Sequence, residues 1–420
     1  MPNRCGPLRI AWALAAASLL TGMHASRALG ADNNQDFIQI ERGRYLAIAG
    51  DCAACHTNPH DQRALAGGRP IQTPFGKVVS SNITPDRETG IGAWTDAQFD
   101  AAVRGGRMPD GSRLYPAMPY PYFTRMSHDD VRALRAYLNT IEPVHNSVQP
   151  DQLPFPFSIR AGMRLWDALY FHPGEFQSEP AKPAQWNRGA YLVEGPGHCG
   201  SCHTPKTWLG GDRSGRPLHG YSIQGWFGPN ITGDQHRGIG DWSAQDVVEY
   251  LKSGHNQFAA ASGPMAEVVA DSSSRMRSAD LEAIASFLKD QPGQSETTSA
   301  LSPFNPTMVA GAAIYQDLCA ACHKADGSGV AYLIPNLAKT GSVASREPTS
   351  QVHVVLHGAN TVATDEEPTA PAMPAFAEQL TDEQVAAVIT YIRNSWGHAA
   401  SAVSASDVHS AREAQGTHHH

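Results

Sequence analysis

The sequence lacks several features that would point to common classes of protein. After the first 30 of its 420 residues it has no apolar run of about 18 residues, so we expect no transmembrane helix in the remainder. It has no cluster of basic residues and a formal net charge of −8, so nucleic acid is not an expected partner. No stretch alternates between polar and apolar residues as a half-buried strand does, and we therefore expect a helical fold.

The first 30 residues are expected to form a secretion signal. Arg4 and Arg9 give this segment a positive start, an apolar stretch follows, and small residues precede a cleavage site before Ala31. A membrane anchor is the alternative, but the apolar stretch is short for a span. At the other end, residues 416–420 finish in three histidines and are interpreted as part of a purification tag.

Cysteine is scarce, and almost all of it lies in one repeated pattern. The chain has 7 cysteines, of which Cys5 falls in the expected signal. The other six occupy three copies of C-x-x-C-H, at residues 52–56, 199–203 and 319–323. No thiol is left for a disulfide, although an exported chain would meet an oxidising compartment. The pattern therefore accounts for every thiol of the expected mature chain.

C-x-x-C-H is the attachment pattern of c-type haem. Each thiol can form a thioether with a vinyl group, and the two-residue spacer places both sulfurs on one helical turn. The following histidine then lies beneath the iron as its proximal ligand. We therefore predict three covalently bound haem c groups. The predicted attachment residues are Cys52, Cys55, Cys199, Cys202, Cys319 and Cys322, and the predicted proximal ligands are His56, His203 and His323.

Structural zinc, a redox dithiol and disulfides are the alternatives for these cysteines. Zinc needs four ligands and usually pairs two C-x-x-C knuckles at short spacing, whereas these copies lie more than a hundred residues apart. A thioredoxin-like site has one such motif beside a βαβ unit, not three motifs that all end in histidine. Haem is therefore the favoured interpretation.

The surroundings of the motif are repeated as well. Residues 42–46 (RGRYL) precede the first copy, and residues 188–192 (RGAYL) precede the second. An Asn-Ile-Thr block follows each of these copies, at residues 82–84 and 230–232. The third repeat is shorter and lacks this block. The first two repeats are therefore close relatives of each other.

Each repeat is expected to close with an amphipathic helix. Ser127, Ser278 and Thr381 each stand at the start of one, followed by apolar residues at helical spacing. The expected core faces are Val131, Leu134 and Leu138; Leu281, Ile284 and Leu288; and Val385, Val388 and Ile392. The predicted fold class is all-α, with three tandem class I cytochrome c-like domains whose long loops pack on haem. The expected organisation is a signal peptide at 1–30, a first domain at 36–142, a Pro- and aromatic-rich linker at 143–180, a second domain at 181–290, a flexible linker at 291–306, a third domain at 307–398 and a tail at 399–420.

Sequence register identifies candidates for the sixth iron ligand. Met118 and Met265 stand at the same distance, 62 residues, after the histidines of the first and second motifs. Met373 follows the histidine of the third motif by 50 residues and precedes the closing helix. His/Met ligation raises the reduction potential and leaves no open position at the iron, which favours electron transfer over oxygen or peroxide chemistry. His255 and His357 are the alternatives, as second histidine ligands.

Three other residues are candidates for supporting contacts with haem. Pro335 follows the third motif, and its backbone carbonyl is placed to orient the ring of His323. Arg69 and Arg216 each precede a proline and are candidates for binding haem propionates. The alternative for both arginines is a solvated side chain.

The linker between the first two repeats is expected to contain an amphipathic helix at about 158–171. Its apolar face includes Trp166 and Tyr170. The simpler interpretation is that this face packs between the two domains. The alternative is that it contacts a partner or the membrane surface.

The combination of motifs resembles the triple-haem cytochrome c subunit of membrane-bound bacterial dehydrogenases. The resemblance rests on the three C-x-x-C-H motifs, the secretion signal, residues 82–85 (NITP) with 91–95 (IGAWT), and residues 115–120 (YPAMPY). Complexes of that family oxidise alcohols, sugars, gluconate, sorbitol or aldehydes in the periplasm. The resemblance implies that a separate large subunit, carrying FAD or PQQ, oxidises the substrate.

The same resemblance implies the role of this chain. It would be a subunit with no catalytic residues of its own, and it would pass electrons through its haems to ubiquinone. It would lie on the periplasmic side of the bacterial inner membrane, associated with the membrane surface through the complex. A small accessory subunit is a further expected partner.

Two other classes of function stay open at this point. A multihaem peroxidase-type enzyme would need an open iron site, and three candidate methionine ligands argue against one. A free periplasmic electron carrier, or a cytochrome subunit of an oxidase, would purify without a dehydrogenase or with an oxidase core. Association with a flavin- or PQQ-containing subunit separates these classes.

Overall fold

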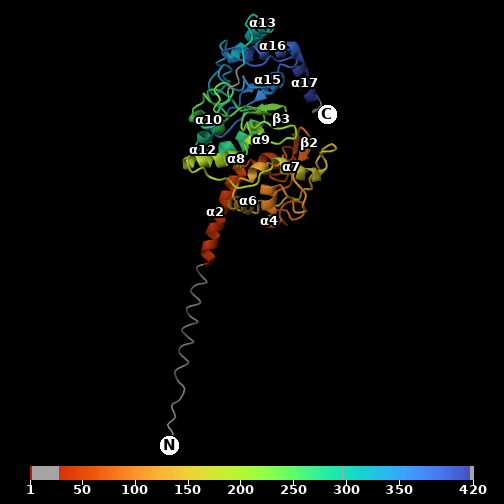
Figure 1. Ribbon diagram of the computed structural model, residues 1–420, viewed down its shortest axis with the longest axis vertical. Coiled ribbons are helices and arrows are strands. Elements are labelled where there is room, and N and C mark those ends of the chain that lie inside the picture. Colours follow the sequence, from red (N-terminus) through yellow and green to blue (C-terminus); the bar gives the residue numbers. More distant parts are fainter. Residues whose placement is uncertain (2–27, 295–297, 417–420) are drawn as a thin grey trace.

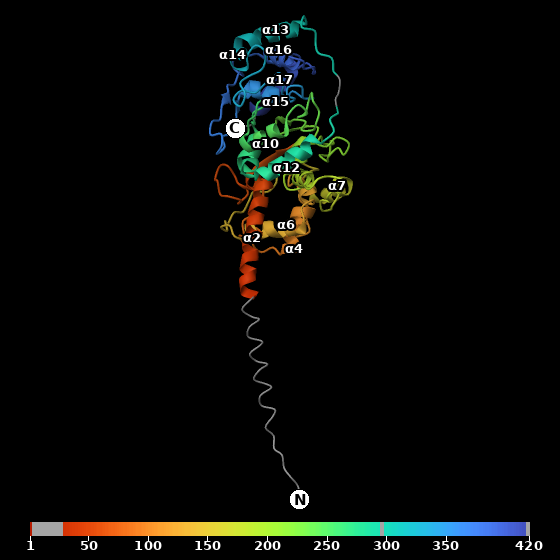
Figure 2. The ribbon, with the colours of Figure 1, turned by 90° about the vertical axis from the view of Figure 1, so that its left-hand side faces the viewer.

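The computed structural model describes Met1, residues 28–294 and residues 298–416. Three helical units are stacked along the longest axis of the molecule, as Figures 1 and 2 show. The first unit (36–142) and the third unit (307–398) lie at the two ends, and the second unit (181–290) lies between them. Most of the expected secretion signal falls on residues 2–27, outside the described residues. Within 28–294 and 298–416, no helix has both the length and the apolar content that a membrane span requires.

The first unit is built on a close crossing of its first and last helices. Its elements are α2 (Ala28–Ala49), α3 (Cys52–His56), β1 (Pro70–Thr73), β2 (Gly76–Val79), α4 (Asp96–Gly105), α5 (Tyr120–Phe123) and α6 (His128–Leu138). The helices α2 and α6 cross at Gly43, where a Cβ would stand 1.9 Å from the carbonyl oxygen of Ala133. Only glycine permits so close an approach of two backbones.

The second unit repeats this arrangement. Its elements are α8 (Ala184–Glu194), α9 (Gly200–His203), β3 (Tyr221–Ile223), β4 (Trp226–Gly228), α10 (Ala244–Ser253), α11 (Pro264–Asp271), η2 (Ser273–Arg275) and α12 (Ser278–Lys289). Here α8 and α12 cross at Gly189, where a Cβ would again stand 1.9 Å from a carbonyl oxygen, that of Ala283. The repeat read in the sequence is therefore also a repeat in space.

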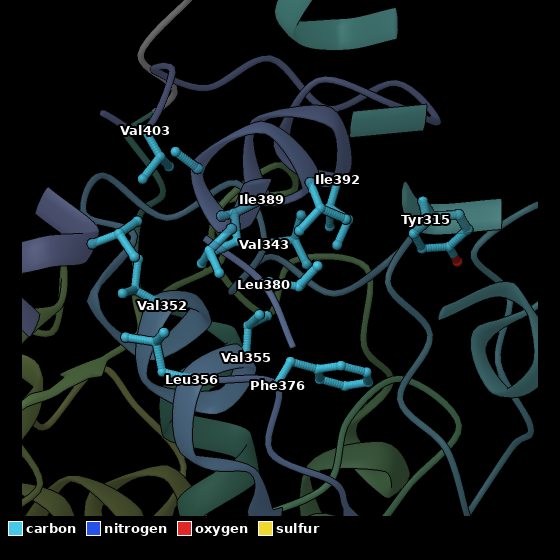
Figure 3. Packing of buried hydrophobic residues seen from close by; sticks show 14 residues of the cluster. Tyr315, Val343, Val352, Val355, Leu356, Phe376, Leu380, Ile389, Ile392 and Val403 are labelled. Carbon is cyan, nitrogen blue, oxygen red and sulfur yellow. The ribbon is translucent and has the colours of Figure 1, made fainter. Parts of the chain in front are cut away.

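The third unit has the same crossing with a different surround. Its elements are α13 (Pro306–Ile314), the π-helical turn η3 (Tyr315–Cys319), α14 (Ala320–His323), α15 (Thr349–His357), β5 (Ala359–Asn360), β6 (Ala372–Met373), α16 (Asp382–Arg393) and α17 (Ala405–Gly416). Gly311 of α13 lies against the carbonyl of Ala387 in α16. Figure 3 shows the core beneath this crossing, with Ile389 and Ile392 facing Val355, Leu356 and Phe376.

The three closing helices form where the sequence predicts them. Ser127 and Thr381 cap α6 and α16 through their side chains, and α12 begins at Ser278 itself. All nine apolar residues predicted to face the cores are buried. Caps and helical spacing are local signals, which is why these helices could be read directly from the sequence.

The structure also contains three small hairpins that were not predicted. They pair β1 with β2, β3 with β4, and β5 with β6. Their strands have two to four residues, too few to show an alternation of polar and apolar residues. The β3–β4 hairpin turns through Gln224 and Gly225, whose φ values of 53° and 77° match a two-residue type I′ loop.

The linker helix is confirmed, and it packs between the first two units. It comprises η1 (Arg160–Gly162) and α7 (Met163–Tyr170). The indole nitrogen of Trp166 donates to the carbonyl of Leu209 at 2.9 Å, and the Tyr170 ring fills the space where Gly211 lacks a side chain. The simpler interpretation of this aromatic face is therefore the right one.

The expected tail at 399–420 is wrong for most of its length. Val403 and Val408 are buried in the third core, and Arg412 pairs with Asp382 at 2.9 Å. The segment is short and largely polar, but two valines and one arginine suffice to seat α17 on α15 and α16. Residues 417–420, with the histidines of the expected tag, lie outside the described residues.

The linker at 291–306 is bound to a neighbouring unit at each end, within its described residues. Gly233 donates to the carbonyl of Gln291 at 2.9 Å, and Leu301 donates to the side chain of Asn394 at 3.0 Å. These contacts tie its start to the second unit and its end to the third unit.

Candidate haem sites

Each C-x-x-C-H motif forms a short helical turn after a longer helix. In the first unit α2 ends at Ala49, and Asp51 takes a left-handed conformation with a φ of 51° before α3 begins. The second unit has a similar break, with His198 at a φ of 36°. In the third unit the π-helical turn η3 runs directly into α14. A helix therefore precedes the motif in each repeat, although in two of them a turn separates the motif from it.

The motif histidines of the first two units are held by backbone carbonyls. Nδ1 of His56 lies 2.7 Å from the oxygen of Ser81, and Nδ1 of His203 lies 2.7 Å from the oxygen of Pro229. A carbonyl oxygen only accepts, so Nδ1 carries the proton and Nε2 keeps the lone pair that can bind iron.

The two carbonyls come from equivalent places in the repeats. Each belongs to the residue just before an Asn-Ile-Thr block. The Asn82 side chain accepts from the backbone and hydroxyl of Thr84 at 2.9 and 2.7 Å, and Asn230 accepts from Thr232 at 2.8 Å in both cases. The block thus folds into a tight turn that fixes the carbonyl. Sequence reasoning found the block but missed this role, for which the repetition was the available signal.

The third motif uses the carbonyl that the sequence predicts. Nδ1 of His323 faces the oxygen of Pro335 at 3.4 Å, longer than the equivalent contacts of the other units. Burial lowers the pKa of all three motif histidines, since it disfavours the charged imidazolium. Neutral imidazole is the form that binds metal.

The described cysteines lie in surroundings that suit a porphyrin edge. All six are free of disulfides. Burial raises the pKa of the Cys52 and Cys199 thiols to about 12, because it disfavours the thiolate. Within the described residues there is no group of three or more His, Cys, Asp or Glu that could hold a metal ion, so the donor set gives no support to the zinc alternative.

The candidate methionine ligands of the first and third units pack against the same apolar cores as a cysteine of their own motifs. Met118 and Cys52 pack against the same apolar core. Met373 and Cys319 likewise share the core of the third unit. A thioether and a thiol from opposite ends of each repeat therefore converge on one apolar region.

Met265 is placed differently. It lies in the first turn of α11 and packs against a small cluster of Ala261, Val269 and Val362, the last of which comes from the third unit. Cys199 packs against the larger core of the second unit instead. The methionine candidate of the second unit therefore also lies at the boundary with the third unit.

The two alternative histidine ligands stay available. His255 and His357 each bury an Nε2 atom that has no hydrogen-bond partner among the described residues. Nδ1 of His255 faces the carbonyl of Ser253 at 3.1 Å, so its Nε2 also keeps the lone pair. Replacing each histidine and each methionine in turn distinguishes which of them binds the iron.

Both arginines considered for propionates lie close to a motif. A cavity of about 290 Å³ close to the second motif has five basic side chains and two carboxylates in its lining, namely Arg216, Lys206, Arg213, Arg237 and Arg346 with Asp234 and Glu347. The excess of positive charge around this cavity suits carboxylates. Arg69 donates to the carbonyl of Ala54 in the first motif at 2.5 Å and pairs with Glu267 at 2.8 Å.

The residues present therefore fit haem c. Paired thiols, an imidazole with a free Nε2, an apolar surround and a candidate thioether are the donor set that this group requires. Helical units carrying such a set are the defining features of a c-type cytochrome. The family model for cytochrome c matches residues 40–142 and 308–396.

Comparison with known proteins gives a narrower family. The chain is 40% identical to the cytochrome c subunit of the quinone alcohol dehydrogenase of Gluconacetobacter polyoxogenes, over 97% of this chain and 90% of that protein. It is 39% identical to the gluconate 2-dehydrogenase cytochrome c subunit of Pantoea cypripedii, over 94% of both chains. It is 38% identical to the fructose dehydrogenase cytochrome subunit of Gluconobacter japonicus, over 89% of this chain and 82% of that protein. The chain belongs to this family of dehydrogenase cytochrome c subunits, and hence to its electron-transfer rather than its catalytic subunits.

Proposed function

We propose that this chain is a triple-haem cytochrome that carries electrons from a dehydrogenase subunit containing FAD or PQQ to ubiquinone. It works after export, on the periplasmic side of the bacterial inner membrane, and meets the membrane surface through its complex. A small accessory subunit completes that complex. The observation that carries the proposal is the repeated histidine whose Nδ1 faces a backbone carbonyl, in a chain similar along most of its length to dehydrogenase cytochrome subunits.

The proposed haem-binding residues are those predicted from the sequence. They are Cys52, Cys55 and His56 with Met118; Cys199, Cys202 and His203 with Met265; and Cys319, Cys322 and His323 with Met373. Haem c held by these residues would supply one-electron chemistry. The task of the protein is to orient the histidines, hold the methionines and keep water away from the site.

The family model matches the first and third units, and the assignment of the second unit as a cytochrome domain rests on its likeness to the first unit. Both units have a glycine at the crossing of their first and last helices and an Asn-Ile-Thr turn that fixes a histidine-binding carbonyl. The proposed domains are residues 36–142, 181–290 and 307–398, the last extended by α17.

The test is purification of the native complex from membranes through this chain. We expect a large subunit that contains FAD or PQQ, and reduction of the haems by its substrate. Alcohols, gluconate and fructose, which the relatives' names include, are the first substrates to try. Peptide masses should show haem at all three cysteine pairs.

Three results would contradict the proposal. A chain that purifies alone or with an oxidase core would show that the partner is wrong. Turnover of peroxide by the purified cytochrome, with an open position at one iron, would favour the peroxidase-type enzyme. A chain with fewer than three haem adducts would refute the triple-haem assignment.

A further inference from the structure

The first and second units contain the same internal salt bridge. Nε of Arg42 lies 2.6 Å from Asp130, and Nε of Arg188 lies 2.7 Å from Asp280. Each pair joins the first helix of a unit to its closing helix. The two arginines occupy the same place in the Arg-Gly-x-Tyr-Leu repeat, so the bridges are equivalent.

Each of these aspartates also accepts a hydrogen bond from the other unit. The hydroxyl of Tyr45 donates to Asp280 at 2.6 Å. In the opposite direction, the hydroxyl of Tyr191 donates to Asp130. Burial and the neighbouring carboxylate raise the pKa of Tyr45 to about 12, so its hydroxyl stays protonated and donates. The two units therefore exchange equivalent tyrosines across their interface.

The interface also brings part of the first unit onto the second motif. Tyr122 lies against Gly200 of that motif, where a Cβ would stand 2.8 Å from the tyrosine ring. Its hydroxyl donates to Asp212 at 2.5 Å. The next residue, Phe123, stacks on His198 just before the motif, with ring centroids 5.4 Å apart.

A reciprocal contact brings the second unit onto the first motif. Glu267 of α11, the helix that carries Met265, pairs with Arg69 at 2.8 Å. The same arginine donates to the carbonyl of Ala54, inside the first motif, at 2.5 Å. The helix that carries Met265 thus reaches the first motif through Arg69, and the segment that follows Met118 contacts the second motif through Tyr122.

The third unit has no part in this exchange. Two residues after its crossing glycine, Gly311, where the other units have Tyr45 and Tyr191, it has Ala313. The tyrosine that follows, Tyr315, is fully buried, and its hydroxyl donates to the carbonyl of Lys324 at 2.7 Å, within its own unit. The third unit meets the second elsewhere, where the ring centroids of Trp226 and His353 are 4.3 Å apart.

We propose that Tyr45 and Tyr191 are positioning residues, whose exchange between the first and second units holds the first two haem-binding motifs together as one fixed pair. Hydrogen bonds from a protonated hydroxyl to a carboxylate that is already paired with arginine favour a single arrangement of the two units. The inference rests on the proposed function, because the pair matters for electron transfer only if both motifs carry haem.

The experiment uses the full chain in its native complex, with Tyr45→Phe, Tyr191→Phe and the double variant. Tyr315→Phe is the control, since it removes a tyrosine hydroxyl that bonds within one unit. Two haems held at a constant distance and angle give a split signal in Soret-region circular dichroism, and thermal unfolding of each variant separates loss of this pairing from a general loss of stability. We expect this signal to diminish in each single variant and to disappear in the double variant, with unchanged haem adduct masses.

Amide hydrogen exchange supplies a second readout that does not depend on haem absorption. We expect each single substitution to raise exchange at residues 52–56 and 200–203 about tenfold, because a hydrogen bond to a charged group contributes a factor of this order. In Tyr315→Phe only the region around residues 315–324 should change.

The results separate this inference from the proposed function. Three haem adducts with no split signal in the wild type, or with an unchanged signal and unchanged exchange in the double variant, would overturn the pairing alone. Missing adducts at Cys199 and Cys202 would overturn the triple-haem function. Amide hydrogen exchange at residues 52–56 would then decide the inference alone: faster exchange in the tyrosine variants would support it, and unchanged exchange would overturn it.

Discussion

At the scale of single residues, each motif histidine faces a backbone carbonyl, whereas the second and third sites each offer more than one candidate for the other iron ligand. Met265 and His255 are both candidates in the second unit. Met265 packs at the boundary with the third unit, and His255 buries a nitrogen without a partner. The identity of the donor affects the reduction potential, because a thioether favours the reduced iron more than a second imidazole does.

Replacing the methionines one at a time should identify the distal ligands. We expect Met118→Ala, Met265→Ala and Met373→Ala each to remove part of the far-red sulfur-to-iron absorption band and to lower the potential of one haem. His255→Ala and His357→Ala are the controls and should leave the band unchanged. Loss of the second haem's low-spin spectrum in His255→Ala, but not in Met265→Ala, would assign that site to two histidines.

A second prediction concerns the glycine that distinguishes the second motif from the other two. The first and third motifs read C-A-A-C-H, whereas the second reads C-G-S-C-H. We expect Gly200→Ala to destabilise the protein by about 1–3 kcal/mol, since the new methyl group would overlap the Tyr122 ring. Thermal unfolding measures the effect.

Gly105→Ala is the matched control. A Cβ at Gly105, in α4, would meet no atom within 4 Å. Alanine in a helix is favoured over glycine by roughly 0.5–1 kcal/mol, so this variant should be as stable as the wild type or slightly more stable. Equal destabilisation by both alanines would show that contact with Tyr122 is not the cause.

Side-chain chemistry decided which site residues could be predicted. The cysteines and histidines of the motifs could be recognised by residue type and spacing, because thiols form the thioethers and imidazole binds iron. The carbonyls of Ser81 and Pro229 could not be found in this way, since every residue has a carbonyl. Tyr45 and Asp280 are 235 residues apart, and no local pattern connects them.

At the scale of elements, the helices were predictable and the hairpins were not. In a capped helix such as α16, the capping residue Thr381 indicates the start, and the spacing of the apolar residues indicates the buried face. A hairpin of two- or three-residue strands depends on its turn and on what packs around it. The prediction of a tail at the end of the chain was wrong for a related reason, because α17 is held by contacts with α15 and α16 and not by its own composition.

Removal of α17 is therefore expected to weaken the third unit. A chain that stops after Ser404 loses the buried side chain of Val408, which contributes about 1.5–3 kcal/mol, and also the Arg412–Asp382 pair. Unfolding of the third unit should move to lower temperature, whereas the first two units should be unaffected. Ser410→Ala, at an exposed position of α17, is the control. An unchanged transition in the shortened chain would restore the interpretation of this segment as a tail.

At the scale of the whole molecule, the order of the units is set by contacts between residues far apart in the sequence. The second unit lies in the middle, with the exchanged tyrosines on one side and the Trp226–His353 contact on the other. Neither interface could be read from the sequence, because each depends on how complete units fit together.

The interface between the first two units should be sensitive to acid. Burial opposes the charge of Asp280, but hydrogen bonds from Arg188 and Tyr45 outweigh it and lower its pKa, with Arg277 acting in the same direction. A carboxyl whose pKa is lower in the folded state stabilises the fold above its unfolded pKa of about 4. This contribution is lost as the pH falls through the folded value.

Asp280→Asn tests this expectation in thermal unfolding followed from pH 7 to about pH 3. The variant should be less stable than the wild type at neutral pH, and the difference should shrink in acid. Ser410→Ala, at an exposed position of α17, adds and removes no titrating group and should follow the wild type at every pH. A difference between Asp280→Asn and the wild type that stays constant down to pH 3 would be the contrary result.

Both interfaces of the middle unit contain contacts with carboxylates, and this gives the molecule two places at which acid can act. Tyrosines bonded to carboxylates close the first junction, so protons and salt can loosen it. At the second junction Trp226 meets His353 and Val362 packs on Val269, and here too carboxylates take part, because Glu347 accepts from Ser222 and Glu366 pairs with Lys252 at 3.6 Å. The proposed relay would therefore be open to interruption by acid on either side of its middle station.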